Sequence, residues 1–155
     1  MQVDPKMKKI LGLDKVNQVG IVVRDMDRAI KNYEEILGVS FPKVVIPDYF
    51  NRVYRGKPEN FRMKIGLAMM GELQIELIQP LEGKTIYAEF LEKWGQGIHH
   101  LGFDVKDLDE RVAAFRGLGI GVLMSGERVG GKFAYMDTEG TLGIMVELMQ
   151  REKSL

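Results

Sequence analysis

Cysteine is absent from this chain of 155 residues, so neither disulfide bonds nor thiolate chemistry are available to it. Neither sign of charge is in excess, because lysine plus arginine and aspartate plus glutamate each number 22. A chain without net charge has no field that recruits nucleic acid, and we expect a small-molecule or protein partner instead. No apolar stretch approaches the roughly 18 residues of a membrane span, and the first residues lack the apolar core of a signal peptide. We therefore expect a cytoplasmic protein with no membrane partner.

What the chain does have is an internal repeat. The segment QVGIVVRDMDRAIKNYEEI, from Gln18, matches HLGFDVKDLDERVAAFRGL, from His100, at an offset of 100 minus 18, or 82. In each copy apolar residues alternate and an aspartate follows, which is typical of a strand that leads into a capped amphipathic helix. A later pair of segments also matches, LQIELIQ from Leu73 and IMVELMQ from Ile144. The sequence therefore predicts the same order of elements twice.

The fold class follows from the runs between these matched segments. KVVIPDYFNRVYR and FRMKIGLAMMG in the first copy, and IGVLMSGERVG and GKFAYMDTEG in the second, each predict one strand bounded by turn residues. The unit is then βαβββ, with residues 14–80 as the first module, 81–97 as a helical connector and 98–150 as the second module. We predict one α+β domain, in which the tandem βαβββ modules form a curved, barrel-like mixed sheet around a concave cavity for a metal or ligand.

Four polar residues occupy equivalent positions in the strands of the two modules: Gln18, Glu76, His100 and Glu147. Side chains alternate along a strand, so each of the four points away from the apolar face that we expect to pack under the helices. A pseudo-twofold arrangement would bring them together on the concave face. Two carboxylates, an imidazole and an amide oxygen suit a divalent cation. By the same alternation His99 is predicted to lie on the opposite face and to be structural.

These features carry a resemblance that covers the chain from about Val16 to Gln150. The tandem modules resemble the vicinal oxygen chelate superfamily, which contains glyoxalase I, extradiol dioxygenases, antibiotic resistance proteins and methylmalonyl-CoA epimerase. Within it, FLEKWGQGIHHLGFDVKDLD followed by GKFAYMDTEGTLGIMVEL is most similar to the epimerase branch, where a short helix precedes a strand that contains Gly, Ile, His and His.

The resemblance implies a divalent metal cofactor, one of Co, Mn, Zn, Ni or Mg. Its ligands would be Gln18, Glu76, His100 and Glu147. The family usually has histidine at the position of Gln18, and the harder amide donor shifts the expected preference from zinc or nickel toward magnesium, manganese or cobalt. The resemblance also implies a homodimer, with a site completed within one chain or shared across the dimer.

The leading hypothesis for function is a metal-dependent epimerase, an isomerase that acts on a methylmalonyl-CoA-type thioester by proton abstraction and a chelated enolate. Glu147 is the candidate for one catalytic base. Where the epimerase branch can place a carboxylate, on the middle strand of the first module, this chain offers only Lys64. Asp104, on the cavity face four residues after His100, is therefore the candidate for the second base. The basic residues of NRVYRGKPEN are available for coenzyme A phosphates but are interpreted as solvated surface charges.

Two alternatives stay open. One is a glyoxalase I-like lactoylglutathione lyase acting on the hemithioacetal of a thiol, because that reaction uses the same ligand positions and the same enolate chemistry. The other is a non-catalytic small-molecule-binding protein of this superfamily, because Gln18 replaces the usual histidine and the second base is not evident. Proton exchange at C2 of the thioester tests the epimerase, thioester formation from the hemithioacetal tests the lyase, and stoichiometric metal together with turnover would eliminate the non-catalytic protein.

Overall fold

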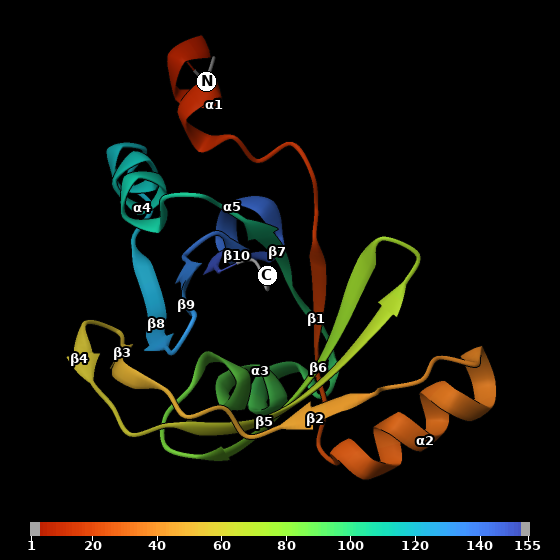
Figure 1. The fold of residues 1–155 in the computed structure, drawn as a ribbon. Helices are drawn as coiled ribbons and strands as arrows, with labels where there is room; N and C mark the ends of the chain where they lie inside the picture. The colour runs from red at the N-terminus through yellow and green to blue at the C-terminus, as the bar shows by residue number, and fades with distance from the viewer. Residues whose placement is uncertain (1–3, 153–155) are drawn as a thin grey trace.

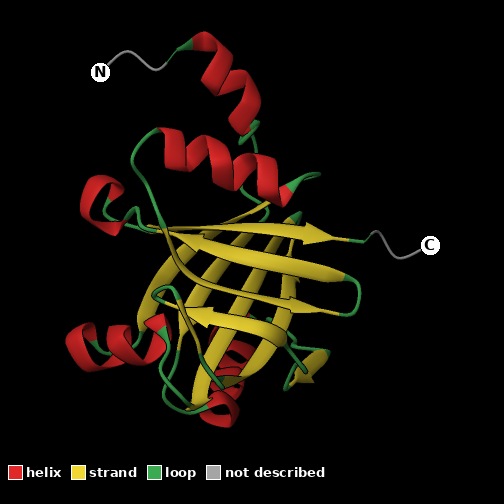
Figure 2. Cartoon of the chain, turned by 90° about the vertical axis from the view of Figure 1, so that its left-hand side faces the viewer, coloured by secondary structure: helices red, strands yellow, loops and turns green. Residues whose placement is uncertain are grey.

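The computed structural model describes residues 4–152, whose strands form a single ten-stranded mixed sheet curled into a half-barrel (Figures 1 and 2). The helices are α1 (Pro5–Leu11), α2 (Met26–Leu37), α3 (Ile86–Trp94), α4 (Leu108–Gly117) and α5 (Glu139–Leu142). The strands are β1 (Gln18–Val22), β2 (Lys43–Val45), β3 (Phe50–Tyr54), β4 (Lys57–Pro58), β5 (Arg62–Met70), β6 (Leu73–Glu82), β7 (Gly97–Asp104), β8 (Val122–Arg128), β9 (Gly131–Met136) and β10 (Met145–Arg151). The predicted α+β class with a curved mixed sheet is confirmed.

The repeated segments of the sequence form the middle of this sheet. The strand order is β2-β5-β6-β1-β7-β10-β9-β8-β3-β4. In each half the first strand pairs in parallel with the last, β1 with β6 and β7 with β10, and the halves meet in the antiparallel pair β1 and β7. The four strands that carry the predicted ligands are therefore neighbours.

Each half has an apolar layer between its sheet and its helix, as the alternation predicts. Ile75 and Leu77 of β6 are buried in a cluster with residues of α2, and Val146 and Leu148 of β10 are buried with residues of α4. A third apolar cluster lies on the concave side, where α3 inserts Tyr87 among residues of both halves. Because the third cluster contains residues of both halves, its burial favours the association of the two halves.

Equivalent hydrogen bonds begin the two repeated helices. The side chain of Asp25 accepts from the backbone N–H three residues on, at 3.1 Å, and Asp107 does the same at 3.0 Å. The backbone N–H of the first residue of α2 donates to Oε1 of Gln79 (2.8 Å), and that of α4 donates to Oε1 of Gln150 (2.9 Å). The terminal glutamines of LQIELIQ and IMVELMQ thus tie each helix to the last strand of its own half.

One part of the sheet differs from the prediction. KVVIPDYFNRVYR, expected as one strand, forms both β2 and β3, which lie at opposite ends of the sheet, with β2 beside β5 and β3 beside β8. Pro47 cannot donate a backbone hydrogen bond, and Asn51 has a positive φ of 48°, so a continuous strand is not available here. The segment 46–49 instead connects the two ends across the open side of the half-barrel.

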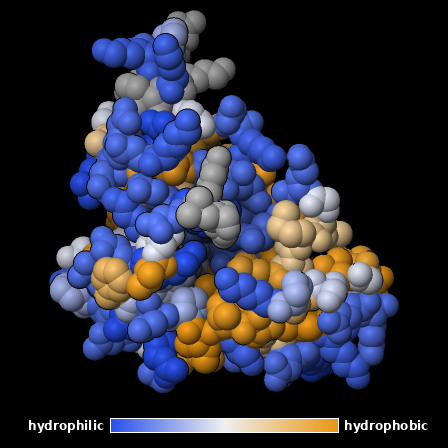
Figure 3. All heavy atoms as spheres, in the orientation of Figure 1, coloured by the Kyte–Doolittle hydropathy of each residue, from blue (hydrophilic) through white to orange (hydrophobic). Residues whose placement is uncertain are grey.

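Figure 3 shows a mostly hydrophilic surface around α4, whereas apolar surface gathers in the lower half of the view. Exposed apolar side chains on β2 and β5 include Val44, Met69 and Met70. Within residues 4–152, no helix combines the length and the apolar composition needed to cross a membrane.

Candidate functional site

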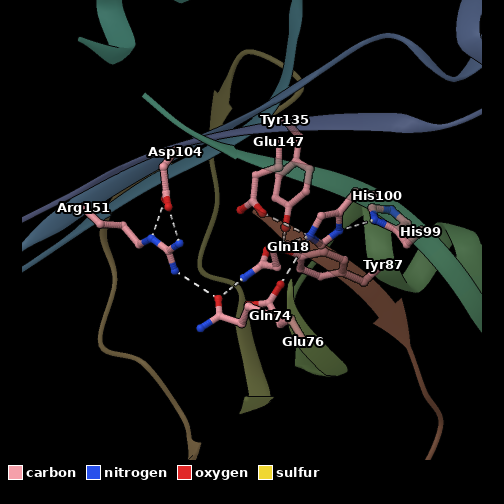
Figure 4. Close-up of polar contacts among 10 residues, drawn as sticks. All are labelled: Gln18, Gln74, Glu76, Tyr87, His99, His100, Asp104, Tyr135, Glu147 and Arg151. Atoms are coloured by element: carbon pink, nitrogen blue, oxygen red, sulfur yellow. Dashed lines mark hydrogen bonds and ion pairs between the residues drawn. The ribbon is translucent and has the colours of Figure 1, made fainter. Parts of the chain in front are cut away.

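The structure brings together the four predicted ligands on the concave face (Figure 4). Gln18, Glu76, His100 and Glu147 come from β1, β6, β7 and β10, and each is at most 8% exposed. Nε2 of His100 lies 3.1 Å from Oε2 of Glu147, 3.3 Å from Oε2 of Glu76 and 3.2 Å from Oε1 of Gln18. The imidazole nitrogen is thus the centre of the cluster.

Two glycines make room for this cluster. In the antiparallel pair of β1 and β7, Gly20 lies opposite His100 and Gly102 lies opposite Gln18. A Cβ atom at Gly20 would lie 1.8 Å from Cε1 of His100, and one at Gly102 would lie 3.0 Å from Oε1 of Gln18. Each of these two ligands therefore packs over a glycine of the other half. The sequence carries the corresponding signal, a glycine two residues after each ligand, which our sequence analysis did not assign a role.

A proton on the imidazole of His100 compensates part of the negative charge of the cluster. Burial alone lowers the pKa of His100, but the carboxylates of Glu147 and Glu76 outweigh it and raise that pKa to about 9. Burial raises the pKa of Glu76, against the hydrogen bond from His100, which lowers it. At neutral pH the site thus holds a positive charge between two buried carboxylates.

The donor set fits a divalent cation. One ligand atom from each of Glu76, His100 and Glu147 lies within 4.8 Å of the others. Two carboxylates and an imidazole are ligands that first-row divalent metals accept, and Gln18 adds an amide oxygen. A cation bound there would replace the imidazolium proton as the compensating charge.

His99 does not lie on the opposite face, and that prediction is wrong. The pairing of β1 with β7 passes from Gly20 opposite His100 to Ile21 opposite Ile98, so His99 is the extra residue of a β-bulge. The bulge interrupts the alternation and turns both imidazoles toward the same side, with their Nδ1 atoms 3.1 Å apart.

His99 is nevertheless packed as a core residue. Its ring contacts those of Tyr87, Phe90 and Tyr135 edge-on or tilted, at centroid distances of 5.2 to 5.9 Å. Burial and the adjacent His100 lower the pKa of His99 to about 3, so its imidazole is neutral at neutral pH.

Asp104, the candidate for a second base, is not part of the cluster. Its Oδ1 and Oδ2 accept from Nε and Nη2 of Arg151, both at 2.7 Å. Both oxygens of this carboxylate are therefore engaged by the guanidinium of Arg151. The remaining Nη1 of Arg151 donates to Oε1 of Gln74 (3.0 Å), and Nε2 of Gln18 donates to the same oxygen (2.8 Å). Neither Gln74 nor Arg151 is distinguished by the sequence repeat.

A cavity of about 470 Å³ opens above the cluster. Gln18, Glu76 and Glu147 line its inner end, and Tyr49, on the segment that connects β2 to β3, lines its wall with its ring edge-on to Phe133 at 5.1 Å. The departure of this segment from the predicted strand is therefore what gives the cavity a wall. A wider cavity of about 1140 Å³ adjoins it and shares Gln74 and Arg151 among other lining residues.

Over residues 17–136 the chain matches the family described as the Glyoxalase/Bleomycin resistance protein/Dioxygenase superfamily. The chain belongs to this superfamily. The resemblance that the sequence motifs carry, to the vicinal oxygen chelate fold, is thereby confirmed.

Several known proteins are similar to this chain over most of its length. The chain is 27% identical over 141 residues to the uncharacterized protein YqjC of Bacillus subtilis (strain 168), covering 89% of this chain and 93% of that one. It is 25% identical over 146 residues to the mitochondrial methylmalonyl-CoA epimerase of Homo sapiens, covering 91% and 76% of the two chains. Among solved structures, methylmalonyl-CoA epimerase from Mycobacterium tuberculosis matches with a TM-score of 0.61 and 25% identity, over 88% of this chain and 87% of that one.

Proposed function

We propose that this superfamily member is a divalent-metal-dependent epimerase of a methylmalonyl-CoA-type thioester. The observation that carries the proposal is the buried group of Glu76, His100 and Glu147 at the inner end of a cavity, in a chain related to methylmalonyl-CoA epimerases. In this proposal Gln18 is the fourth ligand. The metal is one of the harder divalent cations, because three of the four donors are oxygens.

Glu147 acts as one base in this proposal. The hydrogen removed is on a carbon between a carboxylate and a thioester carbonyl, and the electron pair left behind is delocalised onto the carbonyl oxygen. A bound divalent cation supplies Lewis-acid stabilisation for that oxygen. Burial of Glu147 and the aromatic wall at Tyr49 and Phe133 limit the water around the base. Donation of a different proton, from a second carboxylic acid to the opposite side of the carbon, completes the inversion, after which Glu147 releases its proton to water and the second acid takes one up.

The acid for the opposite side is Asp48 in this proposal. Of the acidic residues described in the range 4–152, Asp48, Glu76 and Glu147 line the inner cavity. Glu76 and Glu147 share one imidazole, so they lie on the same side of a ligand that fills the cavity. Asp48 is on the connection between β2 and β3 and supplies the remaining carboxylate. It takes the place for which the sequence analysis suggested Asp104.

The adjoining wider cavity is the proposed place for the carrier part of the thioester. Its lining includes Lys43, Lys106 and Lys132, and ammonium groups suit phosphate oxygens, although that of Lys132 also pairs with Asp109 at 2.8 Å. Two of the basic residues that the sequence offered for this role are engaged elsewhere, since Arg52 donates to the backbone oxygen of Phe61 and Arg55 pairs with Glu89.

Proton exchange tests the proposal directly. Purified protein loaded with Mn²⁺ or Co²⁺ is incubated with methylmalonyl-CoA in D₂O, and deuterium at C2 is followed by mass spectrometry. We expect exchange well above the protein-free rate, and a loss of about 100-fold or more in Glu147→Gln, because a positioned base contributes roughly that much. Glu35→Gln, the same change on the exposed face of α2, is the matched control and should exchange like the wild type.

The failure of this experiment is also informative. Exchange no faster than without protein would refute the epimerase. Formation of a thioester from the hemithioacetal of methylglyoxal and glutathione would then support the lyase, whereas metal binding with neither activity would support the binding protein.

A further inference from the structure

The amide of Gln18 can present either its oxygen or its nitrogen to the cluster, and the two choices have opposite consequences. In the structure Oε1 faces the cluster, 3.2 Å from Nε2 of His100. Turned over, the amide would place its nitrogen 3.0 Å from Oε2 of Glu147 and 3.2 Å from Oε2 of Glu76. The two carboxylates by themselves favour the nitrogen, since an oxygen facing them is an acceptor facing acceptors. Within the cluster, a bound cation or the protonated Nε2 of His100 favours the oxygen.

Arg151 decides between these orientations through Gln74. A guanidinium has donors and no acceptor, so the Nη1 of Arg151, 3.0 Å from Gln74, requires Gln74 to present its oxygen. That same oxygen accepts from Nε2 of Gln18 at 2.8 Å. Turning Gln18 over would bring two amide oxygens to 2.8 Å from each other. The direction of the hydrogen bonds is therefore set at Arg151 and passed through Gln74 to Gln18.

Asp104 anchors the start of this chain. Its two oxygens hold Nε and Nη2 of Arg151 at 2.7 Å each, which leaves Nη1 directed at Gln74 (Figure 4). The four residues come from β7, β10, β6 and β1, so the chain of hydrogen bonds spans both halves of the sheet. A carboxylate and a guanidinium in this two-bond geometry have a fixed mutual orientation.

We propose that Arg151 and Gln74 are positioning residues that hold the carbonyl oxygen of Gln18 toward the cation site before a cation arrives. The inference rests on the cation-binding part of the proposed function and not on the epimerase activity. It explains how an amide can serve at a ligand position. Residues outside the cluster orient the amide of Gln18 with its oxygen toward the site, whereas the two carboxylates favour its nitrogen.

The positive charge of Arg151 makes the proposal testable, because a purely electrostatic effect and an orienting effect change the metal affinity in opposite directions. A cationic side chain near the site repels a divalent cation, so removing it should tighten metal binding if charge were its only effect. If Arg151 orients the amides, removing it should weaken metal binding, because Gln18 is then free to turn its nitrogen to the carboxylates. The two explanations predict opposite changes for one substitution.

The experiment is calorimetric titration of chelator-treated protein with Mn²⁺. We expect Arg151→Met and Gln74→Leu each to weaken binding about tenfold or more, the scale typical of residues that orient a ligand. Gln74→Glu should bind at least as tightly as the wild type, because a carboxylate still accepts from both Arg151 and Gln18. Arg128→Met is the matched control: it removes a cation that lines the same cavity but contacts none of these amides, and should bind equally or more tightly.

The possible results distinguish failure of this inference from failure of the proposed epimerase activity. Unchanged or tighter binding in Arg151→Met, or wild-type protein that does not bind Mn²⁺, overturns the inference. If Gln74→Leu does not fold, as judged by thermal unfolding in chelator, Arg151→Met and Gln74→Glu still carry the test. The expected binding pattern without proton exchange at the thioester refutes the epimerase and leaves this inference standing.

Discussion

Gly20 and Gly102, the smallest residues at the site, determine its geometry as much as the ligands do, because the ligand side chains pack over them. The ring of His100 occupies the space where a side chain at Gly20 would be, and Gln18 occupies the space over Gly102. When two ligands from facing strands meet at one point, the residue opposite each ligand must lack a side chain. Glycine is otherwise unfavourable in a strand, so its presence here has a specific reason.

Gly20→Ala tests this reasoning. The added methyl group would lie 1.8 Å from His100, so the imidazole must move away from both carboxylates. We expect Mn²⁺ affinity to fall about tenfold or more, measured by calorimetric titration. Gly97→Ala, on the same strand as His100 but with open space around the added atom, should keep the wild-type affinity. Equal affinities in the two variants would contradict the packing argument.

The proton on His100 predicts how metal binding depends on pH. The pKa of His100 is raised to about 9, so below pH 9 the metal-free site carries a proton that a cation must displace. Affinity should therefore rise by up to about tenfold per pH unit between pH 7 and 9 and level off above it. Titrations in two buffers of different ionisation enthalpy should report release of about one proton per cation at pH 7. Affinity independent of pH over this range would contradict the assignment.

At the scale of elements, the last residue of each repeat links strand to helix. Gln79 and Gln150 each accept from the first backbone N–H of the helix in their own half, at 2.8 and 2.9 Å. These donors belong to residues that are buried, Met26 and Leu108, so no water replaces the bond if it is lost. Each copy of the repeat therefore includes a hydrogen bond that attaches its helix to its last strand.

Gln79→Met should lower the free energy of unfolding by about 1–2 kcal/mol, since a buried donor is left without a partner while the side-chain volume is kept. Gln150→Met should have a similar effect, because the contact is equivalent. Urea denaturation of chelator-treated protein measures both. Gln96→Met is the comparison, since its amide accepts at 3.3 Å in an exposed position and should change stability by less. A smaller loss in Gln79→Met than in Gln96→Met would argue against the docking role.

At the scale of the whole molecule, the site joins two halves that also meet in the strand pairs β1–β7 and β3–β8 and in the apolar cluster around Tyr87. Glu76 comes from the first half, whereas His100 and Glu147 come from the second. A cation bound by all three belongs to both halves, and it stabilises only the folded molecule, in which they meet. We still predict two modules, 14–80 and 98–150, and a homodimer. Size-exclusion chromatography with light scattering tests the homodimer.

Divalent cations should therefore raise the stability of the entire domain. With free Mn²⁺ at 100 times its Kd, the free energy of unfolding should increase by about 2.7 kcal/mol, in a single unfolding transition followed by circular dichroism. Adding chelator should reverse the shift. Glu76→Gln should abolish most of it, whereas Glu72→Gln, an exposed residue just before the same strand, should retain it. Two separate transitions, with only one sensitive to Mn²⁺, would contradict the bridging arrangement.

The sequence by itself determined the doubled strand and helix pattern and the identity of the four clustered residues. Both depend on local periodicity: alternation along a strand decides which side chains share a face, and the repeat decides which strands are equivalent. The apolar sets at Ile75 and Leu77, and at Val146 and Leu148, pack under their helices for the same reason.

Only the tertiary structure decided the features in which distant strands act on one another. The bulge that turns His99 inward arises where β7 pairs with β1, the wall at Tyr49 arises because β3 pairs with β8, and Asp104 is held by Arg151, which is 47 residues away in the chain. None of these follows from the alternation within one strand. Register and side-chain pairing between strands depend on contacts that form only when the whole sheet is assembled.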